Sequence, residues 1–277
     1  MPPDGQAKRD AFLARVGAAP LIMGILNLTP DSFSDGGRFN STEAALAHAR
    51  QMVADGCAIV DIGAESTRPG ATPVAEADEL ARIEPVLAEL GASLPAPISV
   101  DTTKAAVARR TAALGAVVIN DVWGLQHDPV MADTVAETET AVVIVHNRAA
   151  LDETIDIVAD MQRFFDHSLK LAQRAGIPHE RIILDPGIGF AKSSRQNRAA
   201  LTRLAELKDY GLPILVGASR KRFLGSLTGD GIEATLVGTV AVNLAAIVAG
   251  AAIIRVHDVA EHAAALRVFH TLRGDGG

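Results

Sequence analysis

The feature that most constrains the fold is an alternation of short apolar segments with longer helical patterns, which runs from Leu21 almost to the end of the chain. Eight short segments are nearly all apolar, as expected for parallel strands buried on both faces. Eight strand–helix units predict an α/β fold, the (β/α)8 TIM barrel, and 277 residues suffice for it. An open doubly wound sheet is the alternative. The strand candidates cover residues 21–26, 58–62, 98–100, 117–119, 141–145, 182–184, 214–216 and 253–256, and the helix candidates cover 42–55, 75–90, 104–114, 155–175, 198–210, 235–249 and 259–272.

The chain shows no linker, low-complexity segment or run of like charges, so we expect one barrel domain over residues 21–277. Residues 1–20 are predicted to be an N-terminal extension, and they lack the apolar stretch of a secretory signal. Residues 236–254 carry no charge and match the length of a membrane span. Because Gly250 splits this stretch and Arg255 follows it directly, we expect a buried helix and strand in a cytoplasmic protein.

The composition excludes several classes of function. A net charge of −7 argues against a protein that binds nucleic acid by neutralising phosphates. With 8 Phe, 1 Trp and 1 Tyr, a platform for stacking bases is also disfavoured. The single cysteine, Cys57, cannot form an internal disulfide or a cysteine zinc site, and we interpret it as a small core residue. We therefore expect small-molecule substrates rather than nucleic acid or a membrane.

Polar or charged side chains follow every predicted strand, at the end where barrel enzymes carry their active sites. One aspartate after a strand is commonly a helix cap or a turn former, so each residue alone is a weak signal. Eight polar strand ends that converge on one end of the barrel, called the mouth below, predict a site. They are Asn27, Asp61, Asp101, Asn120 with Asp121, His146, Asp185, Ser219 with Lys221, and Arg255 with His257.

The chemistry of these side chains indicates a polar heterocycle that carries an anionic group. Asp101 and Asp185 can accept hydrogen bonds from ring N–H groups, and Asn120 can both donate and accept. Arg255 favours bidentate contact with phosphate oxygens, and Lys221 adds a second cation. A salt-bridged loop over residues 255–258 is the alternative.

Two loops carry further signals. Residues 27–37 are long and polar with two glycines, as in many lids. Residues 63–70 place the Thr67 hydroxyl beside the Arg68 guanidinium, and Pro69 restricts Arg68 to extended geometry, which predicts an anion clamp or simply a rigid turn. The chain has no P-loop, no complete dinucleotide fingerprint and no nucleophile elbow.

Seven motifs occur in an order and spacing that resemble the dihydropteroate synthase family of pterin-binding enzymes. The resemblance spans about residues 21–272. The motifs are MGILNLTPDSFSDGG at 23–37, DIGAESTRPG at 61–70, SVDTTK at 99–104, INDV at 119–122, ILDPGIGF at 183–190, GASRKRFLG at 217–225 and IRVHDV at 254–259.

The resemblance implies a (β/α)8 barrel transferase of folate biosynthesis, a target of sulfonamides and usually a homodimer. Such an enzyme joins p-aminobenzoate to (7,8-dihydropterin-6-yl)methyl diphosphate and releases 7,8-dihydropteroate and pyrophosphate. By this resemblance Asp101, Asn120, Asp185 and Lys221 hold the pterin. Asn27, Thr67, Arg68, Arg255 and His257 bind the diphosphate, and Asn27 is also a ligand of Mg2+. Phe33, Thr67, Pro69, Phe190 and Ser219 frame p-aminobenzoate, and Asp101, Asp185, Lys221 and Arg255 are the catalytic set.

Some positions depart from the family pattern: Trp123, Val145, Asn147, Arg148 and Arg222. These bear on sulfonamide binding more than on catalysis. Two alternatives keep a pterin site: a folate-dependent methyltransferase barrel, which needs no diphosphate clamp, and a silent paralogue that binds pterin without turnover.

Overall fold

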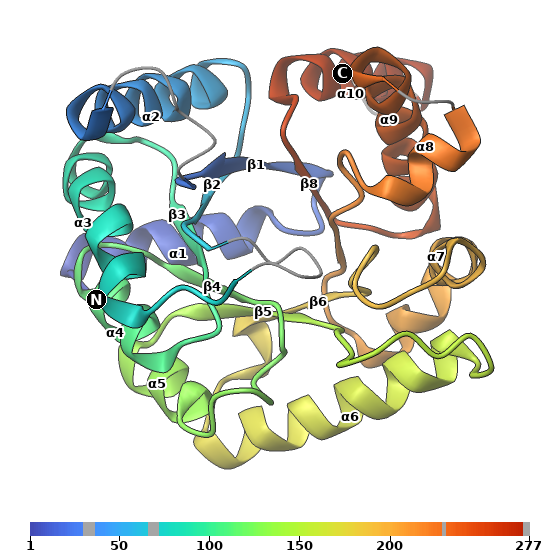
Figure 1. Cartoon of the computed structure of the whole chain (residues 1–277), viewed down its shortest axis with the longest axis horizontal. Coiled ribbons are helices and arrows are strands. Elements are labelled where there is room, and N and C mark those ends of the chain that lie inside the picture. Colours follow the sequence, from blue (N-terminus) through green and yellow to red (C-terminus); the bar gives the residue numbers. More distant parts are fainter. Residues whose placement is uncertain (30–36, 66–71, 229–230, 274–277) are drawn as a thin grey trace.

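The computed structural model describes residues 1–29, 37–65, 72–228 and 231–273. Eight parallel strands form one sheet in the order β6-β5-β4-β3-β2-β1-β8-β7 (Figure 1). A bridge between Leu184 and Ile214 joins the two outer strands, and the Leu184 N–H donates to the Pro213 carbonyl at 2.9 Å. The sheet is thereby nearly closed into a barrel, which confirms the (β/α)8 prediction and excludes the open doubly wound sheet.

The observed strands differ from the predicted ones by no more than one residue at the start and two at the end. β7 is the shortest, and Ile214, just before it, forms the isolated bridge to Leu184. The strands are β1 (Leu21–Asn27), β2 (Ile59–Gly63), β3 (Ile98–Asp101), β4 (Val118–Asp121), β5 (Ala141–Val145), β6 (Ile182–Asp185), β7 (Leu215–Val216) and β8 (Ile253–Val256).

Helices surround the barrel, as Figure 1 shows. The single helix predicted over residues 198–210 was wrong: α7 ends at Thr202 and a 3-10 helix covers Leu204–Tyr210. Neither α5 nor α8 was predicted, since each is short. The α-helices are α1 (Pro3–Arg15), α2 (Gly37–Ala54), α3 (Glu76–Ser93), α4 (Ala105–Ala113), α5 (Met131–Thr138), α6 (Ile157–Ala175), α7 (Ser194–Thr202), α8 (Arg222–Thr228), α9 (Ile232–Ala249) and α10 (Val259–Arg273).

Strand residues alternate between two cores, as the two-residue period of a strand requires. One core fills the barrel and includes Met23, Ile59, Val143 and Ile183, all buried. The other core lies between the strands and the helices, in two clusters, and takes the neighbouring positions, such as Val60 and Ile144. This alternation fixes which residues at the strand ends turn into the barrel.

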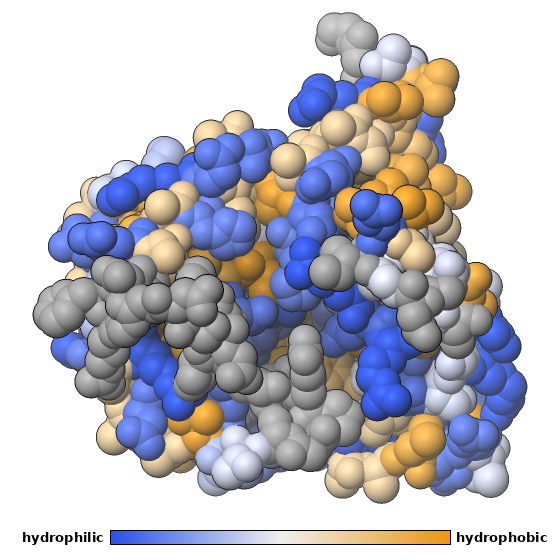
Figure 2. All heavy atoms as spheres, turned by 45° about the horizontal axis from the view of Figure 1, so that its top comes forward, coloured by the Kyte–Doolittle hydropathy of each residue, from blue (hydrophilic) through white to orange (hydrophobic). Residues whose placement is uncertain are grey.

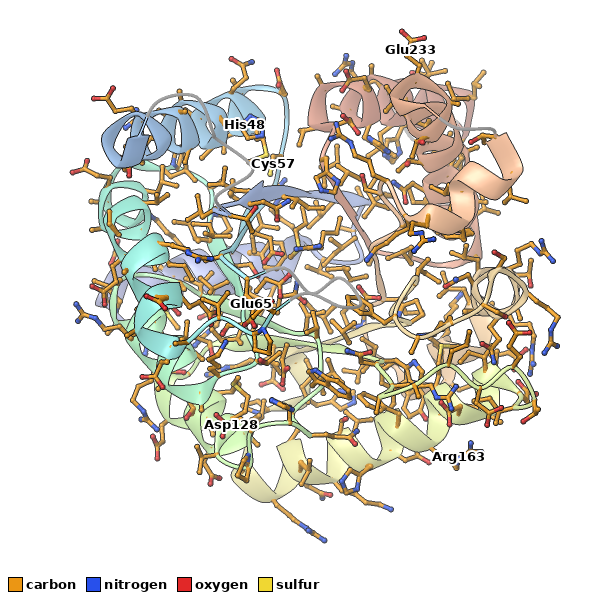
Figure 3. The ribbon with its side chains drawn as sticks, in the orientation of Figure 1. His48, Cys57, Glu65, Asp128, Arg163 and Glu233 are labelled. Carbon is orange, nitrogen blue, oxygen red and sulfur yellow. The ribbon has the colours of Figure 1, made fainter. Side chains whose placement is uncertain are left out.

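The helix α1 belongs to the same packed unit. Its Phe12 is buried in the barrel core, and Lys8 Nζ donates to the carbonyls of Gly91 and Leu94 at 3.2 and 3.3 Å. The division of the chain at residue 20 stays a prediction. Cys57 is buried beside β1 and α2 (Figure 3), and burial raises the pKa of its thiol to about 11, which suits an unreactive core residue.

The apolar stretch over residues 236–254 forms all but the first turn of α9 and the start of β8. Among the residues described, no helix combines the length and apolarity needed to cross a bilayer. Hydrophilic side chains gather near the middle of the face seen in Figure 2.

Candidate active site

The alternation of strand residues between the inside and the outside of the barrel divides the polar residues at the strand ends into two groups. Asp61 lies two positions after Ile59, and Asp185 lies two after Ile183, so both continue the inward-facing series of their strands. Arg255 follows Ile253 in the same way, and Asn120 follows Val118. The inward set also holds Asn27 and Asp101, and it brings these side chains together at the carboxyl end of the barrel.

Asp121 and His146 do not continue the inward-facing series of their strands. Their side chains contact the surrounding loops and helices instead. The Asp121 carboxylate accepts the backbone N–H groups of Trp123 and Leu125 at 2.9 and 2.6 Å, which shapes the turn after β4. His146 Nε2 lies 3.2 Å from Asp160 Oδ2 on α6, and burial lowers the pKa of this histidine to about 4. For these two residues, a structural role explains the polar side chain at the strand end.

Arg255 is the centre of the inward set. Its Nε donates to Asp61 Oδ2 at 2.6 Å, and its Nη2 donates to Asp101 Oδ2 at 2.8 Å. Asn120 Nδ2 donates to the same Asp61 oxygen at 3.1 Å. Four strands, β2, β3, β4 and β8, thus meet in one hydrogen-bonded cluster, Asp61–Asp101–Asn120–Arg255, called the central cluster below.

The electrostatics of the central cluster favour a bound cation or N–H donors. Burial raises the pKa of Asp101, the Arg255 guanidinium lowers it in part, and Asp61 raises it further. Burial opposes the charge of Arg255, yet the two carboxylates outweigh it and raise the pKa of the guanidinium. Within the described residues, Asp61 Oδ1 and Asn120 Oδ1 are buried acceptors that no donor reaches. An unmatched buried acceptor is costly, so both are available to a ligand.

Asp185 and Lys221 extend the site toward β6 and β7. Asp185 Oδ1 accepts the Gly187 N–H at 2.6 Å, and burial raises the pKa of this carboxyl to about 6. Lys221 Nζ lies 4.4 Å from the centre of the Phe190 ring, a cation–π contact that joins two predicted site residues. Gly189 suits this close approach, because its φ of +86° is one that other residues rarely adopt and a Cβ there would lie 2.9 Å from Lys221 Cδ.

Ser219 and His257 form a pair on the β7 and β8 side of the mouth. Ser219 Oγ accepts the His257 backbone N–H at 3.2 Å and lies 3.0 Å from His257 Nδ1. Burial, then the charges of Arg220 and Arg255, lower the pKa of His257 to about 4, so its ring is neutral near pH 7. Asp258 pairs with Arg220 instead of closing a salt-bridged loop with Arg255.

Asn27 ends β1, and its Oδ1 lies 3.9 Å from the point where a Cβ on Gly63 would stand. The Asn27 amide oxygen is a hard ligand of the kind that Mg2+ takes, and this ion keeps several waters and few protein ligands. The residues present therefore fit this ion. Four predicted site residues, Phe33, Thr67, Arg68 and Pro69, lie outside the described residues.

Asp61 is a site residue that the sequence-based assignment left out. In the sequence, Asp61 is one polar strand end among eight. The signal was present: Asp61 stands between Val60 and Ile62 within an otherwise apolar strand, and burying an aspartate there demands a partner. That partner, Arg255, is 194 positions away, so the pairing could not be read from local sequence.

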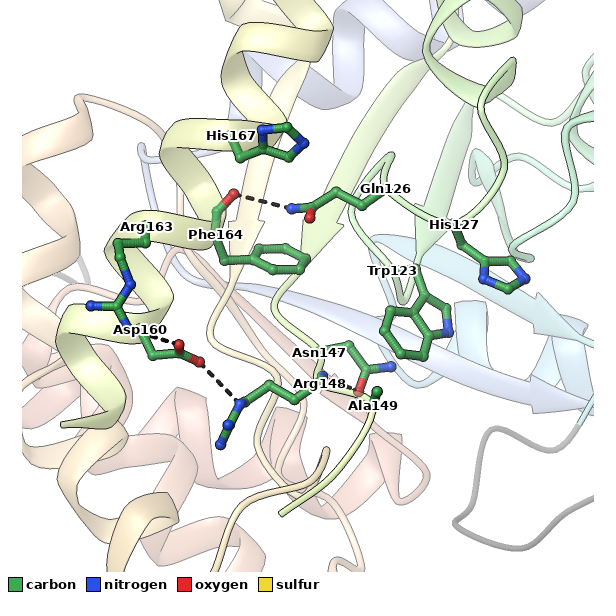
Figure 4. Close-up of a pocket in the computed structure, with 10 residues that line it drawn as sticks. All are labelled: Trp123, Gln126, His127, Asn147, Arg148, Ala149, Asp160, Arg163, Phe164 and His167. Atoms are coloured by element: carbon green, nitrogen blue, oxygen red, sulfur yellow. Dashed lines mark hydrogen bonds and ion pairs between the residues drawn. The ribbon is translucent and has the colours of Figure 1, made fainter. Parts of the chain in front are cut away.

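Three residues that depart from the family pattern line a separate open hollow. Trp123 follows β4, and Asn147 and Arg148 follow β5; α6 forms the opposite wall with Asp160 and Phe164 (Figure 4). Arg148 Nε pairs with Asp160 Oδ2 at 3.2 Å. None of the described residues of the central cluster lines this hollow.

Comparison with known proteins gives a consistent result. Residues 23–257 match the model of the pterin binding enzyme family. The chain is 45% identical to the dihydropteroate synthase of Bacillus subtilis over 257 residues, 93% of this chain and 90% of that protein. A crystal structure of dihydropteroate synthase from Clostridium difficile with pteroic acid superposes with a TM-score of 0.90 at 44% identity, covering 93% and 98% of the two chains. The Xanthomonas albilineans enzyme with 4-aminobenzoic acid gives a TM-score of 0.88 at 44% identity, covering 92% and 93%. The chain therefore belongs to the pterin-binding enzyme family and, within it, to the dihydropteroate synthases, which are transferases of folate biosynthesis.

Proposed function

We propose that this chain condenses p-aminobenzoate with (7,8-dihydropterin-6-yl)methyl diphosphate, and that the central cluster with Asp185 and Lys221 is where it does so. The observation that carries the assignment is the set of buried, partly unpaired acceptors around Arg255 inside the barrel mouth. Solved relatives hold pteroic acid, which joins a pterin to p-aminobenzoate, and 4-aminobenzoic acid itself.

The pterin lies, in this proposal, against Asp101, Asn120, Asp185 and Lys221. Its ring carries amide and amine N–H groups, which match the carboxylates and the free oxygen of Asn120. Asp61 joins the site as the residue that holds Arg255 and Asn120 in place. Val145 continues the inward-facing series of β5 and belongs to the core inside the barrel.

The reaction forms one bond and breaks one. The amine nitrogen of p-aminobenzoate attacks the methylene carbon, and the C–O bond to diphosphate breaks with its electron pair on oxygen. The amine then loses a proton to the departing diphosphate or to water. Positive charge that develops on the pterin methylene is stabilised by the Asp101 and Asp185 carboxylates, which are already in place. An arylamine is unprotonated at pH 7, so no strong base is needed.

The diphosphate is assigned to Asn27, Thr67, Arg68, Arg255 and His257. Arg255 uses Nε and Nη2 on the two aspartates, which leaves Nη1 for a phosphate oxygen. Asn27 would hold Mg2+, and the ion would neutralise charge on the leaving diphosphate. The p-aminobenzoate is assigned to Phe33, Thr67, Pro69, Phe190 and Ser219.

A homodimer is the proposed assembly, and α9 supplies the argument. Its exposed positions run along one helix face at Glu233, Val237, Ala241, Ala245 and Val248. Val237 and Val248 are 68% and 64% exposed, so this face is apolar where a solvated helix would be charged. Figure 2 shows hydrophobic atoms gathered on the side of the molecule where α8, α9 and α10 lie.

Release of pyrophosphate tests the assignment. The protein would be mixed with magnesium, the pterin diphosphate and p-aminobenzoate, each omitted in turn. Release that requires p-aminobenzoate and yields dihydropteroate is the expected result. Binding of the pterin diphosphate without turnover would indicate a silent paralogue, and methyl transfer from a folate would indicate a methyltransferase barrel; either outcome overturns the proposal.

A further inference from the structure

A buried lysine to which the proposed function gives no role contacts the loop beside the candidate site. Lys192 is in the loop of residues 186–193, which joins β6 to α7, and only 8% of it is exposed. Its Nζ donates to the carbonyl of Gly187 at 2.7 Å and to those of His146 and Phe190, each at 3.3 Å. Every hydrogen bond that this ammonium makes to the described residues therefore ends on a backbone carbonyl.

The three carbonyls belong to the ends of two neighbouring strands, β5 and β6. His146 directly follows β5, and its N–H donates to the Asp185 carbonyl of β6 at 2.9 Å, which extends the pairing of these strands (Figure 1). Gly187 and Phe190 lie in the loop that follows β6. The ammonium has three N–H groups, one for each carbonyl, and it thus fastens this loop to the end of β5.

Gly187 is where the loop comes closest to β5. Its φ is +64°, and a Cβ there would lie 1.8 Å from the His146 carbonyl oxygen, so the approach requires glycine. The Gly187 carbonyl accepts the Phe190 backbone N–H at 3.1 Å as well as Lys192 Nζ. Lys192 therefore closes the same turn that places Phe190.

The backbone of Lys192 is fixed from α7. Asn197 of this helix is buried; its Nδ2 donates to the Lys192 carbonyl at 3.2 Å, and its Oδ1 accepts the Gly189 N–H at 2.7 Å. The next residue, Ser193, caps α7 and exchanges hydrogen bonds with Gln196 at 3.3 and 3.0 Å. The Lys192 side chain thus extends from a fixed point toward the three carbonyls.

The loop supports two groups that the proposed function assigns to substrates. Asp185 Oδ1 accepts the Gly187 N–H at 2.6 Å, so one glycine connects the Lys192 ammonium to the Asp185 carboxylate. The Phe190 carbonyl also binds Lys192, while the Phe190 ring lies 4.4 Å from Lys221 Nζ. A displacement of this loop would therefore move both groups.

Burying the Lys192 charge is costly. Burial lowers the pKa of Lys192 to about 7, and the charges of Arg148 and Lys221 lower it further, whereas those of Asp185 and Asp160 raise it. An apolar side chain would fill the same space without this cost. The placement of the ammonium among three carbonyls is better suited to holding one loop geometry than to filling a core.

We propose that Lys192 is a positioning residue, whose ammonium holds the loop in the geometry that Asp185 and Phe190 need to contact the pterin and p-aminobenzoate. The inference rests on the proposed function, which assigns Asp185 to the pterin and Phe190 to p-aminobenzoate. Lys192 itself is assigned no contact with either substrate.

The test compares Lys192→Met, which removes the charge and all three donors, with Lys192→Gln, which keeps two N–H donors without the charge. Calorimetry should show that Lys192→Met binds pteroic acid about tenfold more weakly than the wild type, and that Lys192→Gln recovers part of this loss. Lys8→Met is the matched control, because Lys8 Nζ also donates to two carbonyls but lies on α1, and it should bind as the wild type does. Unchanged affinity in Lys192→Met, or an equal loss in Lys8→Met, would overturn the inference.

The pH dependence distinguishes positioning by the ammonium from a general loss of packing. Burial raises the pKa of Asp185 to about 6, and the Gly187 N–H and the charges of Lys221, Arg255 and Lys192 offset part of this effect. At pH 6 the wild type has a charged Lys192, and removing that charge leaves more Asp185 protonated. At pH 8 Asp185 is ionised in each variant and the wild-type lysine has lost much of its charge. The loss of affinity should therefore be larger at pH 6 than at pH 8, and an equal loss at both would overturn the inference.

Hydrogen exchange reports on the loop without any ligand. The Phe190 N–H, which donates to the Gly187 carbonyl, should exchange faster in Lys192→Met than in the wild type, and unchanged exchange would count against the proposal. If Lys192→Met does not fold, Lys192→Gln at pH 6 takes its place. A wild type that binds pteroic acid but releases no pyrophosphate would overturn the proposed function, whereas weaker binding by Lys192→Met would still support the positioning role.

Discussion

Arg255 on β8 and Asp61 on β2 are joined by a hydrogen bond of 2.6 Å, although β1 lies between their strands. The guanidinium therefore reaches across β1 inside the barrel, and it is oriented before any substrate binds. Its second aspartate contact, to Asp101, fixes the plane of the group. A group that is already oriented contributes more to transition-state stabilisation than one that must reorganise.

Removing Arg255 leaves two buried carboxylates without their cation. We expect Arg255→Met to destabilise the fold by about 3–5 kcal/mol and to abolish most activity. Chemical denaturation and steady-state kinetics would measure both effects. Arg163→Met is the matched control, since Arg163 pairs with Asp160 at the exposed hollow and should change stability by less than about 1 kcal/mol. A similar stability loss in both variants would contradict this prediction.

Asp185 is expected to lower the stability of the free protein while serving its function. Burial raises the pKa of its carboxyl from 3.8 to about 6, so the folded protein binds the proton more tightly than the unfolded chain. The contribution of Asp185 to stability is then full below about pH 4 and is lost as the pH rises through about 6.

The variant Asp185→Asn should accordingly be more stable than the wild type at pH 8 by about 2–3 kcal/mol, and equal to it near pH 4. Its activity should fall by at least about a hundredfold, since removal of one preorganised group has that effect. Urea unfolding at several pH values checks the first statement. A wild type that is the more stable form at pH 8 would refute it.

His257 is expected to stay neutral throughout the working range of the enzyme. Burial and the nearby arginines lower the pKa of the ring to about 4, and Ser219 accepts the His257 backbone N–H. If the Ser219 hydroxyl donates to Nδ1, the ring proton is on Nε2 and available to a phosphate oxygen. Nitrogen NMR should show the Nε2–H form and no titration between pH 5 and pH 8; a midpoint near the usual value of about 6.5 would rule this out.

Asn27 is expected to couple magnesium to diphosphate binding. Asn27→Ala should weaken the binding of magnesium pyrophosphate by about tenfold or more, because a hard oxygen ligand is lost. Calorimetry with and without magnesium would measure it. The control is Asn147→Ala in the separate hollow, which should bind as the wild type does. Equal losses in the two variants would remove Asn27 from this role.

The apolar face of α9 is expected to lie between two copies of the chain. Val237→Glu combined with Val248→Glu should convert a dimer into a monomer, because buried like charges oppose association. Sedimentation velocity measures the change in mass. Exposed Val130→Glu, on a different part of the surface, should leave the oligomeric state unaltered. A wild-type monomer at micromolar concentration would disprove the assembly.

The sequence alone predicted much of the fold. The spacing of apolar residues, with the residues that begin and end helices, predicted the bounds of the eight strands to within two residues. This is possible because a strand buried on both faces must be apolar along its length. The sequence-based prediction failed for the single helix expected over residues 198–210, where a turn at Arg203 separates α7 from a 3-10 helix. Short helices such as α5 carry too few periodic residues to be seen.

The sequence also determined the chemistry of the site, because the types of residue that end the strands are fixed by the chain itself. Only the tertiary structure decided which of them converge. Asp121 and His146 stand at strand ends as Asp101 and Asp185 do, yet strand phase turns them away from the mouth. The pairing of Arg255 with Asp61 arose in the same way, since closing the barrel brings β8 and β2 to either side of β1. Local sequence specifies what each strand end can bind, but the register and closure of the sheet decide which ends meet.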